Sequence, residues 1–355
     1  MAAISDEQAI AFLHEIVSLY SPSGREAAVA DAIVRQMRAW GYDSSEVDAA
    51  GNAVGILGPG PRRLLLLGHI DTVPGVIPVR VADGVLHGRG AVDAKGPFAA
   101  MVVAAARAGA LTGATVHVVG AVEEECATSA GARLVAHTYP RPDAIIIGEP
   151  SRWDRVTLGY KGRLLIDYSR TQPMAHRAGR QATACEAAVA FWEQVAAYAS
   201  AYNTGKERQF DMLDTSLRQI KSGDDGLYEQ VTMCIGMRLP LGLDVPMLQQ
   251  LLAKWAGEAT VTTRGLEQPV SAPQRNGLTS AFLAAIRVEG GKGAFVYKTG
   301  TSDMNVLARH FDTPIVAYGP GDSSLDHTPE ERLEVDEFLR ACRVLQGVIE
   351  RLARQ

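Results

Sequence analysis

Unbroken apolar runs, each followed at once by an ionisable side chain, recur through the first half of this chain. "LLLLG" (64–68) leads into His69, "VHVVGAV" (116–122) into three glutamates, and "AIIIG" (144–148) into Glu149. Strands this apolar are typical of a parallel sheet that helices cover on both faces. Helical patterns alternate with them, so the predicted fold class is α/β with a mostly parallel, helix-covered sheet.

The alternation of buried strands and helices is interrupted near residue 155. From 155 to 270 the strands become amphipathic, two helices are expected, and a polar stretch ends near 226. This pattern indicates a smaller α+β domain with one open sheet face. After residue 270 the alternation of buried strands and helices returns. A chain of 355 residues is long enough for two domains. We therefore predict a catalytic domain from 1–154 and 271–355, with an inserted domain at 155–270.

Composition excludes several classes of protein. The net charge of −5 argues against a nucleic-acid partner, which usually meets a basic surface. No apolar segment is long enough to span a bilayer, and no basic-then-apolar leader opens the chain, so neither a membrane partner nor a signal peptide is expected. The four cysteines are far apart, which predicts reduced thiols and a cytoplasmic location.

Ionisable residues follow several predicted strands, and together they suggest a metal site. In open α/β sheets, ligands bind at the carboxyl ends of the strands. Each residue alone has an ordinary explanation as a helix cap, a turn or a solvated loop. Carboxylates grouped at one buried edge would nevertheless repel each other unless a cation lay among them. A set of histidines, aspartates and glutamates without cysteine suits Zn, Mn or Co. The set comprises His69, Asp71, Asp93, Glu123, Glu124, Glu125, Glu149 and His327.

Other catalytic motifs are missing from the sequence. "GRGAVDAKG" lacks the spacing of a phosphate loop, no GxGxxG follows a strand, and no GxSxG is present. Cys126 stands beside the acidic run, where neighbouring carboxylates would raise the pKa of a thiol. It is therefore interpreted as structural rather than nucleophilic.

The order of these motifs resembles one enzyme family. HxD at 69–71, "GRGAVDAKG", the acidic run, "GEP" and a late histidine resemble the M20 metallohydrolases of the aminoacylase/carboxypeptidase type. "GHIDTVPG", "TLGYKGRL", "KTGTSDMN" and "YGPGDSSLDHTPEE" are most similar to its branch of amino-group carrier protein–lysine/ornithine hydrolases. The resemblance implies a zinc-peptidase-like catalytic domain, an inserted lid or dimerisation domain, and a homodimer.

The resemblance also implies the metal ligands. Asp93 would bridge two Zn²⁺ ions per subunit, with Co²⁺ suited to the same ligands. His69 and Glu149 would complete one metal, and Glu125 and His327 the other. Asp71 would orient His69, and Glu124 would be the general base. The family usually has Asp-Glu-Glu where this chain has three glutamates, so Glu123 and Glu124 remain the alternative pair.

Further residues are implied in substrate binding. His176 matches a histidine that reaches the partner subunit's site and polarises the scissile carbonyl. Lys298, Gly300 and Thr301 match a substrate-binding loop. Arg238 matches an arginine that binds the substrate carboxylate, although an ordinary surface arginine fits the sequence equally.

The implied function is release of lysine or ornithine from a small, acidic amino-group carrier protein. The alternative is the same chemistry on a free small molecule: deacetylation of acetylornithine or acetyl-lysine, or dipeptide cleavage. A non-catalytic binding protein on this scaffold is a third hypothesis. The sequence does not choose between lysine and ornithine. Basic residues of the inserted domain are either a docking face for the carrier or a solvated surface: Lys206, Arg208, Arg218 and Lys221.

Overall fold

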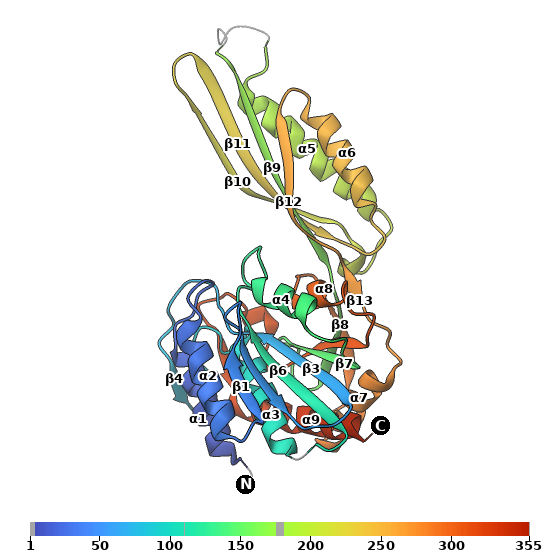
Figure 1. Ribbon diagram of the computed structural model, residues 1–355. Coiled ribbons are helices and arrows are strands. Elements are labelled where there is room, and N and C mark those ends of the chain that lie inside the picture. The colour runs from blue at the N-terminus through green and yellow to red at the C-terminus, as the bar shows by residue number, and fades with distance from the viewer. Residues whose placement is uncertain (1–3, 110, 175–180, 355) are drawn as a thin grey trace. The chain divides into compact units, whose positions relative to one another are not determined.

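A computed structural model describes residues 4–109, 111–174 and 181–354 (Figure 1). The chain forms two compact units. Unit 1 comprises Met1–Gly159, Ser271–Tyr297 and Ser302–Gln355, and unit 2 comprises Tyr160–Val270 and Lys298–Thr301. The first boundary falls after residue 159, rather than after 154, because the strand that begins at Arg155 pairs within the sheet of unit 1.

Unit 1 is built on a nine-stranded sheet in the order β1-β2-β6-β3-β7-β15-β8-β13, with β14 beside β8. The central strands β6, β3, β7 and β15 run parallel, whereas β2 and β8 are antiparallel to their neighbours. The predicted α/β class is thus confirmed, with the parallel strands at the centre. The strands are β1 (Ser44–Val47), β2 (Ala53–Leu57), β3 (Arg62–His69), β6 (Ala114–Ala121), β7 (Ala144–Gly148), β8 (Arg155–Tyr160), β13 (Val270–Ser271), β14 (Ala294–Lys298) and β15 (Ile315–Tyr318).

Helices bury the apolar strands of this sheet. Leu64 and Leu66 of β3 belong to one core with the helices of unit 1, and Leu65 and Leu67 are equally buried on the opposite face. The first helix, Asp6–Ser18, begins with a capping box formed by Ser5 and Gln8. Among the described residues, no helix is long and apolar enough to cross a membrane. The helices are α1 (Asp6–Ser18), α2 (Ala27–Ala39), α3 (Lys95–Ala108), α4 (Ala130–Thr138), α7 (Gly277–Val288), α8 (Asp303–Leu307) and α9 (Val335–Ala353).

A second, three-stranded sheet in unit 1 joins segments that are far apart in the sequence. Its order is β16-β5-β4, with β4 (Arg80–Ala82), β5 (Val85–His87) and β16 (Arg332–Glu334). Strand β5 leads into the glycine-rich turn before Asp93, and β16 follows His327. The small sheet therefore brings the chain around Asp93 close to the chain around His327.

Unit 2 is a four-stranded sheet in the order β10-β11-β9-β12, with two helices on one face (Figure 1). Its elements are β9 (Gly162–Pro173), α5 (Ala184–Asn203), β10 (Asp214–Asp224), β11 (Tyr228–Leu239), α6 (Val245–Ala256) and β12 (Thr260–Glu267). The sequence indicated only a polar stretch before 226, and this interpretation missed β10. Most residues of this edge strand are exposed on both faces, so it lacks the apolar alternation that marks a half-buried strand.

Candidate metal centre

The parallel strands of unit 1 bring the predicted ligands to one edge of the sheet. Strands β3 and β6 are in register at His69 and Ala121, and β3 and β7 are in register at Gly68 and Gly148. The acidic run and Glu149 begin within two residues of these positions. His69, the glutamates and Glu149 therefore leave the sheet side by side, as the apolar runs predicted.

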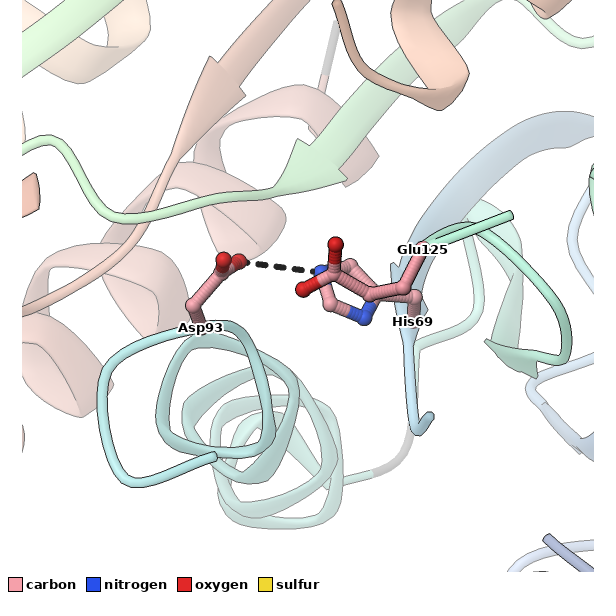
Figure 2. Close-up of side chains that lie close together, drawn as sticks. All are labelled: His69, Asp93 and Glu125. Atoms are coloured by element: carbon pink, nitrogen blue, oxygen red, sulfur yellow. Dashed lines mark hydrogen bonds and ion pairs between the residues drawn. The ribbon is translucent and has the colours of Figure 1, made fainter. Parts of the chain in front are cut away.

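Asp93 lies between the two histidines. Its Oδ1 is 3.1 Å from His69 Nε2, and its Oδ2 is 2.9 Å from His327 Nε2. The same His327 nitrogen is 2.8 Å from Glu125 Oε1. Figure 2 shows His69, Asp93 and Glu125 pointing toward one another, and their ligand atoms lie within 4.8 Å of each other. One carboxylate thus presents an oxygen to each imidazole.

The pKa values of the cluster reflect the cost of grouping several carboxylates in a buried site. Burial raises the pKa of Glu149 well above its usual value, and the nearby carboxylates Asp93 and Asp303 add to the rise. Hydrogen bonds to Asp93 and Glu125 raise the pKa of His327 to about 10. A proton on Glu149 removes its negative charge, and a proton on His327 supplies a positive charge beside Asp93 and Glu125; a divalent metal would replace both. The imidazole and carboxylate donors fit such a metal.

Asp71 holds together the segment of His69 and the segment of Glu124 and Glu125. Its main-chain oxygen lies 3.0 Å from His69 Nδ1, and its carboxylate Oδ1 lies 3.4 Å from that nitrogen. The carboxylate also accepts the main-chain N–H groups of Glu124 (3.1 Å) and Glu125 (3.0 Å) and the Ser23 hydroxyl (2.7 Å). When His69 Nδ1 donates to Asp71, Nε2 is left as the lone-pair nitrogen on the Asp93 side.

The three consecutive glutamates point to different surroundings. Glu123 has a φ of 62°, and its Oε2 accepts the Thr128 hydroxyl at 2.5 Å. Glu125 faces His327, whereas Glu124 is half-buried and interacts electrostatically with His69 and Glu149. The glutamates of the two assignments left open by the sequence therefore differ in their contacts: Glu125 contacts His327, and Glu123 contacts Thr128.

The predicted substrate-binding residues lie in unit 2. Arg238 Nη1 donates to Thr301 Oγ1 at 3.1 Å, and the main-chain oxygen of Lys298 accepts from Lys161 N at 3.3 Å. A Cβ on Gly300 would meet nothing within 4 Å. Arg238 is thus joined to the 298–301 loop. His176 lies outside the described residues.

Two buried acids of unit 1 escaped the sequence interpretation. Asp303 is 2% exposed at the start of α8, after the helix-capping Ser302, and it adds to the rise in the pKa values of Glu124 and Glu149. Glu331 is 1% exposed. Asp303 was missed because an acid after a helix-capping serine is ordinary at the start of a helix. Glu331 was missed because the sequence does not distinguish it from the exposed Glu330 beside it.

The fold and the cluster together define a metal-dependent hydrolase of the α/β class. Residues 65–351 match the peptidase family M20/M25/M40, so the chain belongs to this family. It is 44% identical over 348 residues to the "[LysW]-lysine hydrolase" of Deinococcus radiodurans, with 96% of each chain covered. It is 39% identical over 350 residues to the "Putative [LysW]-lysine/[LysW]-ornithine hydrolase" of Thermococcus kodakarensis, covering 98% of this chain and 93% of that protein.

Solved structures show the same fold. An M20 family metallo-carboxypeptidase from Sulfolobus solfataricus superimposes with a TM-score of 0.79 at 16% identity, covering 98% of this chain and all of the other. A dinuclear metal binding M20 peptidase from Bacillus subtilis gives a TM-score of 0.72 at 13% identity, with 97% of each chain covered. The chain is therefore an M20-type hydrolase, as its motifs predicted, and its buried ligand cluster supports a metal cofactor.

Proposed function

We propose that this enzyme hydrolyses the amide bond joining lysine, or ornithine, to an acidic amino-group carrier protein, in the cytoplasm. The observation that carries this proposal is the 44% identity, over nearly the whole of both chains, with a protein named "[LysW]-lysine hydrolase". The matching chemistry on a free substrate, such as acetylornithine or acetyl-lysine, is the alternative.

The proposal is tested by one comparison of substrates. Carrier-linked lysine, carrier-linked ornithine and the two free acetylated amino acids are supplied to the metal-loaded enzyme, and release of the amino acid is measured. We expect the carrier-linked forms to give the higher kcat/KM. Preference for an acetylated amino acid would replace the carrier with a free substrate, and no hydrolysis of any of them would contradict the proposal.

We propose that the site holds two divalent ions, zinc in the first place, with cobalt able to replace it. Asp93 would lie between them, because its two oxygens face different histidines at 3.1 and 2.9 Å. His69 and Glu149 would complete one metal, and Glu125 and His327 the other. Ions of this kind lower the pKa of water to about 7 and polarise carbonyls.

The protein's own groups would then move the protons. Glu124 takes the proton of the attacking water and passes it to the amine that leaves, so one carboxylate serves as base and then as acid. Asp71 keeps this glutamate in place through its main-chain N–H at 3.1 Å. Arg238, Lys298, Gly300 and Thr301 would bind the substrate, and the Arg238–Thr301 hydrogen bond supports a shared role.

His176 is proposed to donate to the developing oxyanion in the partner subunit of a homodimer. The exposed edge strand β10, with Leu217 and Ile220 39% and 45% exposed, is a surface suited to pairing between copies.

We expect His176→Ala to lower kcat about 10²-fold with metal retained. Mixing it with an inactive metal-ligand variant should restore part of the activity. A monomer in sedimentation, or no restoration in mixed dimers, would contradict the shared site.

A groove with several arginines on the open sheet face of unit 2 supports the proposal of an acidic partner. Arg163, Arg218 and Arg238 line a groove of about 270 Å³ together with Asp214, although the chain as a whole carries a charge of −5. Lys206 instead stacks on Tyr202, and Arg208 lies 3.5 Å from Asp211. Among the basic residues considered from the sequence, Arg218 is therefore the one that faces this groove.

We expect Arg218→Glu to raise the KM for carrier-linked lysine about tenfold, because it reverses a charge that attracts the acidic carrier. The difference should shrink at high salt, which screens exposed charges. The KM for acetyl-lysine should stay unchanged. The matched control is Lys254→Glu, since Lys254 is exposed on α6, away from the groove. Equal effects of the two variants would remove the groove from carrier binding.

A further inference from the structure

Glu331 is a buried carboxylate whose bonds all reach one short segment. Its Oε1 accepts the main-chain N–H groups of Gly90 (2.9 Å), Val92 (3.0 Å) and Asp93 (3.1 Å). Its Oε2 accepts Arg89 Nη1 at 2.7 Å. A carboxylate that is 1% exposed needs such donors, because burying an unpaired charge is costly.

The segment that Glu331 gathers ends at Asp93. Gly90 has a φ of 87°, and a Cβ there would come 2.9 Å from Thr72 Cγ2, so the turn is tight. Three N–H groups that converge on one oxygen restrict where the main chain of Asp93 can lie. The acceptor therefore fixes the base from which the Asp93 side chain reaches both histidines.

Glu331 also belongs to the segment that carries His327. It follows His327 by four residues and precedes β16, which pairs with β5. The main-chain oxygen of Glu331 continues this pairing by accepting Gly88 N at 3.3 Å. Main chain and side chain thus hold together two segments whose ligands, Asp93 and His327, lie 2.9 Å apart.

We propose that Glu331 is a positioning residue of the metal centre, which sets the separation of Asp93 and His327 before a metal binds. Asp71 has the same relation to His69 and the Glu124–Glu125 pair. Glu331 acts through the main chain of Asp93. The inference rests on the proposed roles of Asp93 and His327 as ligands.

The test is titration of metal-free Glu331→Gln with Co²⁺, followed by calorimetry and visible absorption. Glutamine has the same shape, but it removes the charge and turns an NH₂ group toward either Arg89 or the three amides. We expect the Kd for Co²⁺ to rise about 10–100-fold, the usual effect of losing a group that orients metal ligands. Excess Co²⁺ should restore hydrolysis. The exposed neighbour gives a matched control, Glu330→Gln, with an unchanged Kd.

The outcomes separate this inference from the proposed function. Equal Kd values in wild type and Glu331→Gln would overturn the inference alone, even if the variant had a lower Tm. Failure of the wild type to bind Co²⁺ would overturn the proposed ligands as well. If Glu331→Gln does not fold by circular dichroism, Arg89→Gln serves instead, because it removes the ion pair and keeps the three amide bonds. A rise of several-fold in its Kd is expected, and no rise would count against the proposal.

Discussion

Glu124→Gln is expected to keep its metal and lose turnover. The half-buried side chain interacts electrostatically with His69 and Glu149, and its main-chain N–H is held by Asp71 at 3.1 Å; glutamine has the same shape and can occupy the same space. An amide cannot take a proton from water. Losing a general base typically lowers the rate about 10²–10⁴-fold, so we expect kcat to fall by this amount with little change in KM.

The neighbouring glutamate provides the control for this substitution. Glu123→Gln removes a carboxylate that accepts the Thr128 hydroxyl at 2.5 Å, whereas Glu125 contacts His327, so activity close to wild type is expected. Metal content by mass spectrometry and circular dichroism are measured for both variants. Full activity in Glu124→Gln, with loss in Glu123→Gln, would shift the base and ligand assignment by one residue.

Most of the cluster was predictable because apolar strands constrain it strongly. Three buried runs fixed where β3, β6 and β7 end, and parallel register then placed His69, the glutamates and Glu149 at one edge. Neighbouring parallel strands leave little freedom in where their ends lie. His69 alone did not indicate a metal site. The prediction depended on the ionisable residues at the other strand ends.

The orientation of the three glutamates could not be predicted in this way. It depends on the φ of 62° at Glu123 and on two N–H groups that bond to Asp71 from a different strand end. Glu331 was missed for a related reason, since it and the exposed Glu330 are adjacent and identical in type. The two glutamates differ in the main-chain hydrogen bonds that Glu331 accepts in the folded protein. Those bonds come from residues far away in the sequence, so no local sequence pattern predicts them.

Asp93→Asn is expected to lose one metal per chain and almost all activity. Asp93 offers Oδ1 toward His69 and Oδ2 toward His327, at 3.1 and 2.9 Å from their Nε2 atoms. Asparagine keeps one oxygen and turns an NH₂ group toward the other histidine, so it can serve only one ion. Because a two-metal site stabilises the reacting oxygens jointly, we expect kcat/KM to fall about 10³-fold or more.

The same substitution at Asp83, which is exposed in the turn before β5, gives a control that should change neither metal content nor activity. Metal stoichiometry distinguishes the reasons for a loss of activity. A folded Asp93→Asn variant that still holds two metals per chain would show that Asp93 does not bridge them, since the amide nitrogen has no lone pair for a cation. A variant with no metal would show instead that both metal sites depend on the negative charge of Asp93, which favours a cation on either side.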